Sequence, residues 1–387
     1  MRIKTIRQIK KLSNKTVFLR ADFNVPIKDG NIKDDYKIVA TLPTIRFLLR
    51  HGCKIIIATH LGKPNGRNKK FSVKPIADRL GQLLDIKIEL VDNYWNKSTK
   101  ELKADLSEKD ILILENLRFN SGEEKNNKRF GKLLSKMAQI YVNDAFAVSH
   151  RQHASVSVIK KYLPSYAGLL LEKEIKNLNR ILKPQKPMVS VVGGNKVQTK
   201  IKLVKSLGKK SSVVLIGGAL ANSFISAYGF EIGKSTVEQD CIKLAKKFKN
   251  KNIILPIDVL VGKSKNTTEV LAKPVSQVNK NDIILDIGPR TIKLFANYIR
   301  KANTIVWNGP MGYFENSHFK HGTMALVQVV SSRSRGLAFG VVGGGETLEA
   351  FKQAKTLDYL DWVSTGGGAM LAYLSGEKMP GLKKIIK

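Results

Sequence analysis

Residues 188–218 read MVSVVGGNKVQTKIKLVKSLGKKSSVVLIGG and carry the pattern that recurs along the chain. Two short apolar, β-branched runs, Val189–Val192 and Val213–Ile216, are each followed directly by a glycine pair. Between the runs, Lys196 and Lys200 are spaced one helical turn apart. A strand, a glycine turn, a helix and a second strand form a βαβ unit, so this stretch predicts neighbouring strands of a parallel sheet.

The same alternation of strand-like and helical stretches continues in both directions. The predicted strands are Val17–Arg20, Lys54–Ala58, Ile111–Leu114, Ile140–Asn143, Val189–Val192, Val213–Ile216, Ile253–Leu255, Ile283–Asp286, Thr304–Trp307 and Ala338–Val342. The predicted helices are Tyr36–Arg50, Lys125–Ala138, Glu172–Leu182, Val237–Phe248 and Glu346–Ala354. Right-handed crossovers between parallel strands put helices on both faces of a sheet. We therefore expect an α/β fold with doubly wound, Rossmann-like parallel sheets.

The chain divides near Leu182–Pro187, where two prolines follow a helical run and precede a strand. Each half has about 180 residues and its own alternation of strands and helices, which is enough for a separate domain. We therefore expect two domains, 1–168 and 186–375, joined by a helical hinge over 169–185.

Charge is the unusual feature of the composition. The 387 residues include 67 Lys or Arg and 31 Asp or Glu, which gives a formal net charge of +36. Such a charge is typical of proteins that bind nucleic acid or an anionic membrane surface. However, the lysines are scattered, and the sequence has no basic tail, low-complexity arm or nucleic-acid motif. We therefore expect a lysine-coated protein with no specific nucleic acid and no membrane as partner.

Several other classes of protein are excluded by the sequence. It has no apolar run long enough to span a membrane. The basic start, MRIKTIRQIKKL, lacks the apolar stretch and small-residue cleavage site of a signal peptide. Cys53 and Cys241 are too few and too distant for a disulfide framework or a cysteine metal site. We expect a reducing, cytoplasmic setting.

The residues that follow the predicted strands differ between the two halves. In the first half they are polar or basic, namely Asp22, Asn24, His60, Lys63, Arg118, His150 and Arg151. In the second half they are glycine turns, namely Gly193-Gly194, Gly217-Gly218, Gly309-Pro310, Gly343–Gly345 and Gly366–Gly368. Ligands of parallel sheets bind beyond the carboxyl ends of the strands, and glycine turns before helices suit phosphate. Two anion sites on two domains indicate transfer of a group between two ligands.

Each of these signals is weak when taken alone. A strand that ends in Gly-Gly is more often a tight turn than a phosphate site, and a single histidine such as His60 is more often structural. The stretch Gly229–Ser235, GFEIGKS, has three residues between its glycines where a P-loop has four, so it does not predict a phosphate loop.

A series of short motifs makes the combined pattern specific. They are RADFNVP (20–26), LPTI (42–45), THLGKP (59–64), LENLRF (114–119), VNDAF (142–146), HRQHAS (150–155), GGNKVQTK (193–200), DIGP (286–289), WNGPMG (307–312), GGGET (343–347) and STGGGA (364–369). In content and order, over nearly the whole chain, these motifs resemble the phosphoglycerate kinase family.

The resemblance implies a two-domain, hinge-bending enzyme of glycolysis. Such an enzyme transfers a phosphoryl group between 1,3-bisphosphoglycerate and ADP, giving 3-phosphoglycerate and ATP, with Mg²⁺ as cofactor. The resemblance also implies a cytoplasmic monomer in which 1–168 binds phosphoglycerate, 186–375 binds nucleotide, and 376–387 returns to the first domain. Phosphoryl transfer needs positioning and cationic stabilisation of phosphoryl oxygens, which suits the two kinds of strand end.

The resemblance also implies individual site residues. Those for the substrate are Asp22, Phe23, Asn24, Lys37, His60, Leu61, Gly62, Lys63, Arg118 and Arg151. Those for the nucleotide are Gly193, Gly194, Lys196, Lys200, Gly217, Gly218, Asn308, Pro310, Glu315, Gly344, Gly345, Glu346 and Thr347, with Glu315 on the ribose and Glu346 on the metal. The catalytic set is Lys37, Lys196, Gly366 and Gly367. The alternatives are structural, such as a turn cap for Asp22 or surface ion pairs for Arg118 and Arg151.

The sequence departs from the family pattern at several of these positions. Lys37 and Lys63 stand where arginine is usual, which keeps the charge but loses a rigid, bidentate fork for phosphate. Glu346 stands where aspartate is usual, so the metal geometry must adjust to a longer side chain. Smaller departures are Ala147, Val148, Ala219, Met370 and Ala372. Since the phosphate-binding charges are retained, we expect an active but slower kinase.

Two rival interpretations remain open. One is a catalytically weakened descendant that still binds nucleotide through the same fold. The other, based on charge alone, is a nonspecific nucleic-acid binder with a steep salt dependence.

Overall fold

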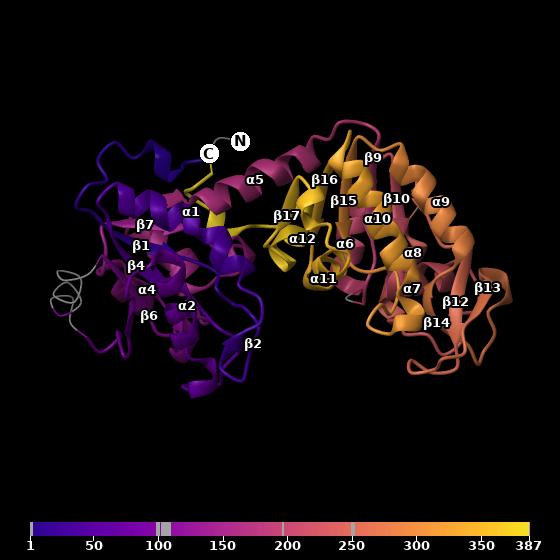
Figure 1. Cartoon of the computed structure of the whole chain (residues 1–387), viewed down its shortest axis with the longest axis horizontal. Helices are drawn as coiled ribbons and strands as arrows, with labels where there is room; N and C mark the ends of the chain where they lie inside the picture. Colours follow the sequence, from indigo (N-terminus) through magenta and orange to yellow (C-terminus); the bar gives the residue numbers. More distant parts are fainter. Residues whose placement is uncertain (1–2, 98–100, 102–109, 196, 249–251, 387) are drawn as a thin grey trace. The chain divides into compact units, whose positions relative to one another are not determined.

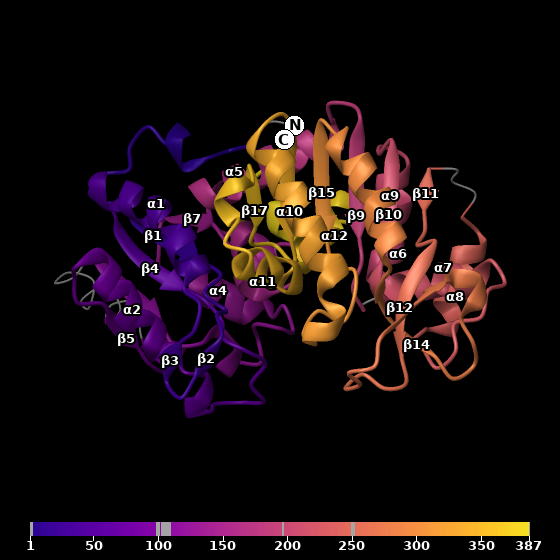
Figure 2. The ribbon, with the colours of Figure 1, turned by 45° about the vertical axis from the view of Figure 1, so that its right-hand side comes forward.

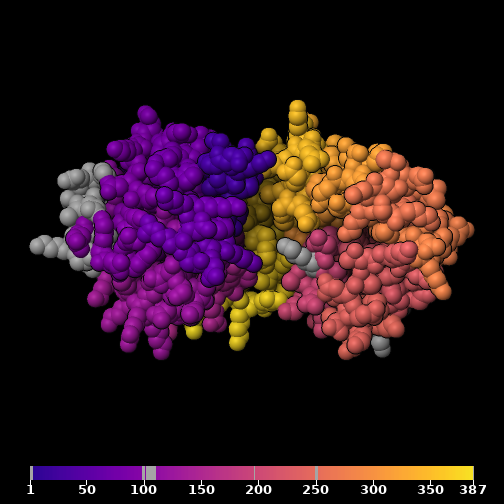
Figure 3. Space-filling model, turned by 90° about the horizontal axis from the view of Figure 1, so that it is seen from below, coloured from indigo at the N-terminus to yellow at the C-terminus, as the bar shows by residue number. Residues whose placement is uncertain are grey.

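The computed structural model describes residues 3–97, 101, 110–195, 197–248 and 252–386. They form two compact units, one of Met1–Lys176 with Lys378–Lys387 and one of Asn177–Glu377 (Figure 1). The boundary between the units falls inside helix α5 (Leu169–Leu182). Buried apolar side chains form the interior of each unit, and Figure 3 shows the atoms on one outer face of the molecule.

The first unit is built on a six-stranded parallel sheet. Its order is β5-β6-β4-β1-β7-β8, and all neighbouring strands run parallel. The strands are β1 (Thr16–Arg20), β4 (Lys54–Ala58), β5 (Glu89–Val91), β6 (Ile111–Leu114), β7 (Ile140–Asn143) and β8 (Ser165–Ala167). A short antiparallel hairpin joins β2 (Ile27–Lys28) to β3 (Asn31–Ile32).

Helices cover both faces of this sheet, because alternate strand residues point to opposite sides. One face packs against α1 (Tyr36–Arg50), α2 (Lys74–Leu84) and the start of α5. The other face packs against α4 (Lys128–Ser135) and the 154–159 segment. A sheet buried on both faces explains why its strands are continuous apolar runs in the sequence.

The C-terminal segment belongs to the first unit. Gly381 N donates to Ser149 O at 2.7 Å, and Lys4 N donates to Ile385 O at 2.8 Å. The buried Lys160 ammonium donates to Pro380 O at 2.5 Å and to Lys383 O at 2.8 Å. The two chain ends therefore lie side by side (Figures 1 and 2).

The second unit contains a second six-stranded parallel sheet. Its order is β11-β10-β9-β15-β16-β17. Figure 2 labels β11, β10, β9, β15 and β17 of this sheet. The strands are β9 (Met188–Val192), β10 (Val213–Ile216), β11 (Ile253–Ile254), β15 (Thr304–Asn308), β16 (Phe339–Gly343) and β17 (Trp362–Ser364). The helices are α6 (Val197–Gly208), α7 (Gly218–Ala227), α8 (Gln239–Lys246), α9 (Pro289–Arg300), α10 (His321–Arg335), α11 (Gly345–Gln353) and α12 (Gly368–Leu374).

A separate three-stranded sheet also belongs to the second unit. It consists of β12 (Asp258–Gly262), β13 (Leu271–Pro274) and β14 (Ile283–Ile287), paired antiparallel in the order β13-β12-β14. The run Ile283–Asp286, predicted as a strand, thus pairs outside the parallel sheet. A short apolar run does not reveal the direction of its partner, which depends on residues distant in sequence.

The predicted fold class is confirmed. Every predicted strand is present, with ends that differ by at most one residue, and every predicted helix is present with less regular ends. Helices α2, α7, α9 and α10 and strands β2, β3, β5, β8, β12, β13 and β17 were not predicted. Within the described part of the chain, no helix is long and apolar enough to span a membrane.

Candidate active site

The topology of each parallel sheet predicts where a ligand binds. In the first sheet, the chain fills positions on one side of β1 before β7 pairs on its other side. In the second, β9 and β15 are neighbours across the same kind of reversal. Ligands of doubly wound sheets bind at such switch points, beyond the carboxyl ends of the strands. The motif after β1 and the motifs after β9 and β15 occupy these switch points, and the motif after β4 follows the strand that pairs with β1.

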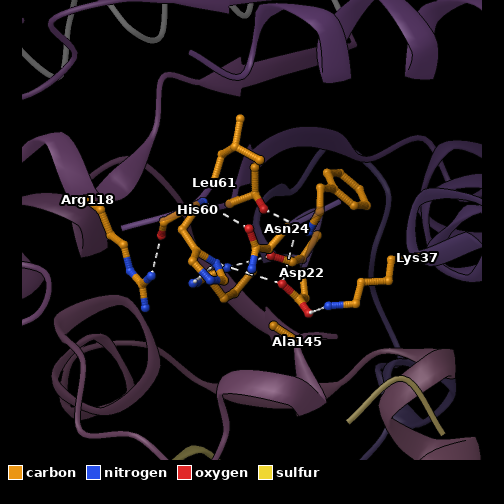
Figure 4. Close-up of polar contacts among 12 residues, drawn as sticks. Asp22, Asn24, Lys37, His60, Leu61, Arg118 and Ala145 are labelled. Atoms are coloured by element: carbon orange, nitrogen blue, oxygen red, sulfur yellow. Dashed lines mark hydrogen bonds and ion pairs between the residues drawn. The ribbon is translucent and has the colours of Figure 1, made fainter. Parts of the chain in front are cut away.

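Asp22 is the centre of the polar cluster in the first unit (Figure 4). Its side chain is buried, and Lys37 Nζ lies 2.7 Å from Oδ2. His60 Nδ1 lies 3.8 Å from Oδ1, and Asn24 N donates to the same oxygen at 3.3 Å. Burial alone raises the pKa of the Asp22 carboxyl, but the charge and hydrogen bond of Lys37, together with the charge of Arg20, outweigh burial and lower the pKa below its usual value.

Asn24 connects the two strand-end loops. Its Oδ1 accepts a hydrogen bond from Gly62 N at 2.9 Å, and Asn24 itself is exposed. Phe23 and Leu61 have buried side chains, so they can offer a ligand only backbone groups. Phe23 N is already bonded to Thr59 Oγ1 at 2.9 Å.

Arg118 approaches the cluster from the segment after β6 (Figure 4). Its NH1 donates to Gly62 O at 2.5 Å, and its Nε lies 3.0 Å from Glu124 Oε1. Within the described residues, the buried NH2 group has no hydrogen-bond partner. Burial lowers the pKa of Arg118, and the nearby charge of Arg151 lowers it further. A buried guanidinium with an open donor next to a second arginine is suited to an anion.

The remaining predicted substrate residue, Lys63, is exposed directly after Gly62. The first unit therefore brings together Asp22, Asn24, Lys37, His60, Gly62 and Arg118 by direct contacts, with Arg151 close to Arg118.

The second unit presents backbone rather than side chains. After each of five parallel strands, one glycine has a positive φ that other residues rarely adopt. These glycines are Gly194 (φ +81°), Gly218 (φ +59°), Gly309 (φ +94°), Gly344 (φ +97°) and Gly367 (φ +47°). The turns also hold each other, since Gly194 N donates to Pro310 O at 2.7 Å and Gly218 N donates to Met311 O at 2.8 Å.

Lys200 projects into these turns from α6. Its side chain is buried, and Nζ donates to Gly193 O. A Cβ atom on Gly309 would overlap both Lys200 Nζ and Gly193 O. The close approach of lysine to backbone therefore requires glycine at 309. Lys196, predicted as catalytic, lies outside the described residues.

Two further predicted residues maintain the turns. Asn308 Nδ2 donates to Gly343 O at 2.6 Å, and Thr347 Oγ1 accepts from Gly309 N at 2.7 Å. Gly366 N donates to Ser364 Oγ at 3.2 Å, and a Cβ on Gly367 would meet no atom within 4 Å. Asn308 and Thr347 thus hold the backbone in place, whereas the Gly367 turn is open.

A cavity of about 230 Å³ lies against the glycine turns. Gly194, Gly218, Pro310, Glu315 and Glu346 line its polar parts. The rest is lined by apolar residues, including Ala221, Ile225, Pro256, Val259, Leu285 and Met311, and by the polar residues Asn195, Asn222, Thr236, Lys265 and Asp286. An apolar cavity with a few polar groups at a sheet switch point is the usual form of a nucleotide site.

Glu346 is the residue that can hold Mg²⁺. It lies in the first turn of α11, and its Oε2 would lie 3.5 Å from a Cβ on Gly194. No group of three or more His, Cys, Asp or Glu side chains able to hold a metal occurs in the part of the chain that the structure describes. Mg²⁺ commonly binds one or two carboxylates together with substrate phosphates, so a single carboxylate beside a phosphate-binding turn fits this ion.

Sequence reasoning missed the buried polar residues that support the first site. Thr59 Oγ1 accepts a hydrogen bond from Phe23 N at 2.9 Å. Asn116 Nδ2 donates to Leu61 O and Phe71 O, both at 2.8 Å. Arg20 is fully buried beside His60. Arg20, Thr59 and Asn116 lie within the recognised motifs, and this position in the motifs was the only available signal.

Comparisons with known proteins agree with this geometry. A family model described as phosphoglycerate kinase matches residues 6–377. The phosphoglycerate kinase of Borrelia garinii subsp. bavariensis is 41% identical over 397 residues, covering 100% of both chains. That of Wolbachia pipientis wMel is 42% identical over 385 residues, covering 97% of both.

Solved structures of this family are also similar. The phosphoglycerate kinase from Coxiella burnetii superposes with a TM-score of 0.87 at 37% identity, covering 99% of both chains. The enzyme from Pyrococcus horikoshii OT3 superposes with a TM-score of 0.85 at 34% identity, covering 99% of this chain and 98% of that one.

Proposed function

Because this chain belongs to the phosphoglycerate kinase family, we propose that its two units divide between them the two ligands of one phosphoryl transfer. The protein is a phosphotransferase with a carboxyl group as acceptor. It carries out the reversible glycolytic transfer between 1,3-bisphosphoglycerate and ADP that gives 3-phosphoglycerate and ATP.

In this proposal the first unit binds phosphoglycerate. One observation carries the assignment: a buried carboxylate, Asp22, and the basic groups of Lys37, His60, Arg118 and Arg151 gather at the carboxyl ends of β1 and its neighbours. The ionised Asp22 accepts a hydrogen bond from the glycerate hydroxyl, Asn24 contributes at the carboxylate end, and His60, Lys63, Arg118 and Arg151 bind the phosphate that is not transferred.

The second unit binds the nucleotide in the cavity beside its glycine turns. The apolar lining suits the base, the exposed Glu315 suits the ribose hydroxyls, and Lys200 with the turn backbone suits the phosphates. Glu346 would hold Mg²⁺, which would supply neutralisation of charge on the phosphate oxygens. The family resemblance assigns Lys37 and Lys196 to the transferring phosphoryl group.

We further propose that this enzyme is slower than it would be with an arginine at position 37. A well-placed donor to the transferring group is worth on the order of 3 kcal/mol. Lys37 keeps the charge, but its Nζ is bonded to Asp22 at 2.7 Å and presents no bidentate fork. The charge is therefore available, while its orientation toward phosphate is poorer.

A coupled assay tests the activity. With saturating ATP, 3-phosphoglycerate and Mg²⁺, we expect turnover far above that of a Lys196→Ala control. Turnover equal to that of the control would contradict the proposed kinase activity. ATP titration in parallel separates a binding-only protein, which would retain affinity without turnover.

We propose that the protein is a cytoplasmic monomer and binds no specific nucleic acid. The same purified protein tests its oligomeric state and its binding of nucleic acid. Sedimentation should give the monomer mass of 43.1 kDa. Retardation of DNA or RNA should occur only at low salt and disappear near physiological salt, because scattered charge gives only nonspecific attraction. A dimer, or retardation that survives physiological salt, would contradict these points.

A further inference from the structure

Arg20 lies beneath the phosphoglycerate site with no exposed surface. Its Nε donates to Ser155 Oγ at 2.9 Å, and its NH1 donates to Ala21 O at 2.5 Å. Its NH2 lies 3.3 Å from His60 Nδ1. Two contacts therefore hold the guanidinium while its third nitrogen is directed at the histidine ring.

Glu123 supplies the counter-charge for this arginine. Its side chain is fully buried, and Oε1 lies 4.0 Å from Arg20 NH2. Glu123 Oε1 accepts from Ser155 Oγ at 2.6 Å, and Oε2 accepts from Ser155 N at 2.9 Å. The Ser155 hydroxyl thus accepts from Arg20 and donates to Glu123, which makes one continuous buried chain. Buried charges persist only when paired and hydrogen-bonded in this way.

The arginine contact determines where the imidazole proton lies. Arginine has only donors and remains charged in proteins. His60 Nδ1 must therefore accept, so its proton is on Nε2. Asp22 Oδ1 would favour a proton on Nδ1, but it is farther away, at 3.8 Å.

Charge and burial favour the neutral ring as well. Burial, followed by the nearby charge of Arg20, lowers the pKa of His60 well below its usual value, although Asp22 opposes this shift. Among the described residues, no group forms a hydrogen bond with Nε2, and the side chain retains 4% exposure. Its N–H is therefore available to a ligand at the Asp22 cluster.

We propose that Arg20, Ser155 and Glu123 are positioning residues that hold His60 as the neutral Nε2–H tautomer, so that His60 acts as a hydrogen-bond donor to phosphoglycerate and not as a cation. The ligand part of this statement rests on the proposed function. A neutral donor avoids repulsion from Lys37 and Arg118 and keeps phosphoglycerate binding independent of pH in the range where a free histidine titrates.

The tautomer can be observed directly in the free enzyme. Long-range ¹H–¹⁵N NMR on ¹⁵N-labelled protein distinguishes the two neutral tautomers from imidazolium. The chain has only 6 histidines, and loss of one set of signals in a His60→Gln variant identifies His60. We expect the Nε2–H pattern, unchanged from pH 8 to pH 5.5. The Nδ1–H pattern, or titration near pH 6.5, would overturn the proposal whether or not the protein is an active kinase.

A double variant, Arg20→Met with Glu123→Gln, tests the positioning role. It removes the donor without leaving a buried carboxylate unpaired. We expect His60 to change to the Nδ1–H tautomer, paired with Asp22, and KM for 3-phosphoglycerate to rise about tenfold with a smaller change in kcat. Glu123→Gln alone retains Arg20 and should retain the Nε2–H tautomer. An unchanged tautomer in the double variant would contradict the proposal, and the wild-type spectrum remains decisive if that variant does not fold.

Two amide substitutions give an independent readout. The amide nitrogen of glutamine occupies the place of histidine Nε2, whereas that of asparagine occupies the place of Nδ1. We expect His60→Gln to have a KM for 3-phosphoglycerate several-fold lower than that of His60→Asn, and the reverse order would contradict a donor at Nε2.

Discussion

The two switch points of this protein offer different chemical groups to a ligand. The first unit uses side chains, because Asp22, Lys37 and Arg118 reach a common centre from three separate segments. The second offers backbone, because five glycines with positive φ follow its parallel strands, and two of them, Gly194 and Gly218, line a cavity there. A site of side chains can lose one charge and keep its shape. A site built from backbone groups has no space for an added Cβ atom where its glycine turns contact each other.

The comparison also separates two kinds of sensitivity. Substitution in the first unit should change affinity or rate in proportion to the donor removed. Substitution in the second should displace the main chain itself. An added Cβ atom would overlap backbone atoms, and rotation of a side chain cannot relieve that overlap. Four sets of variants test this difference, in order of decreasing expected effect.

Gly309→Ala should have the greatest effect. The residue has φ +94°, and its Cβ would overlap Lys200 Nζ and Gly193 O. Strain of about 1–3 kcal/mol, together with displacement of the phosphate-binding turn, should lower kcat/KM for ATP on the order of a hundredfold. Steady-state kinetics with varied ATP measures this.

Gly229→Ala is the matched control for that change. Gly229 has φ +88° in the same unit, but its Cβ would meet no atom within 4 Å. The control therefore carries the backbone strain without the overlap, and it should retain near-normal kinetics. Equal losses in both variants would show that strain alone matters and would remove the distinction between the two units.

Arg118→Ala should weaken phosphoglycerate binding, with an intermediate effect. Its buried NH2 is an open donor beside Arg151, and a charge-assisted contact to phosphate is worth about 2 kcal/mol. KM for 3-phosphoglycerate should rise about thirtyfold. Arg129→Ala removes the same charge from an exposed position on α4. Similar KM values for the two variants would reduce Arg118 to a partner of Glu124.

Lys37→Arg should raise kcat. An arginine can bond Asp22 and still offer a second N–H to the phosphoryl group, which Lys37 Nζ does less well from its 2.7 Å contact. We expect a gain of a few-fold, up to about tenfold. Single-turnover measurements on enzyme saturated with both substrates distinguish chemistry from product release. An unchanged or lower rate would contradict poor orientation at this position.

Asp144→Asn and Asp286→Asn, one in each unit, should have the weakest effect. Burial raises the pKa of each carboxyl from 3.8 to about 7. Between these values the folded state binds more protons than the unfolded state, so stability falls as pH rises from about 4 to 7. Each asparagine variant should therefore gain at least about 1 kcal/mol relative to wild type between pH 5 and pH 8.

Urea denaturation at pH 5, 6, 7 and 8 measures that gain. Asp144→Asn keeps an acceptor for Leu171 N, which bonds Oδ1 at 2.9 Å. Asp286→Asn keeps an acceptor for Ile287 N, 2.8 Å from Oδ1, but loses the one for Gly322 N, 2.7 Å from Oδ2, and that loss lowers its stability to the same extent at every pH. A pH-independent difference from wild type would contradict burial as the cause of the raised pKa.

Much of the parallel-sheet framework was predictable from local sequence. Strands such as Lys54–Ala58 and Ile140–Asn143 are buried on both faces, so they are continuous apolar runs that are easily recognised. Strand β5, with residues only partly buried at Glu89 and Leu90, lacks that signal. The antiparallel pairing of β14 with β12 depends on residues far apart in the chain, which local patterns do not contain.

The site was predictable to a similar degree. The motifs around Asp22, Arg118 and Gly309 contain residue types suited to phosphate, and these are recognisable in the sequence alone. Their supports were not predictable, because Ser155 and Glu123 meet Arg20 only after the chain has folded. A sequence carries no sign of which buried donor faces which acceptor.

Local sequence is sufficient to establish that this protein has two doubly wound sheets, a cationic set of strand ends and a glycine-rich set, and membership of a phosphotransferase family. These properties reside in short segments, where period, turn residues and motif order are local. Folding in three dimensions is what pairs Lys37 with Asp22, excludes a Cβ from Gly309 beside Lys200, and requires a neutral His60 beside Arg20. Such relations depend on distances of a few ångströms between segments remote in the chain, and packing alone sets those distances.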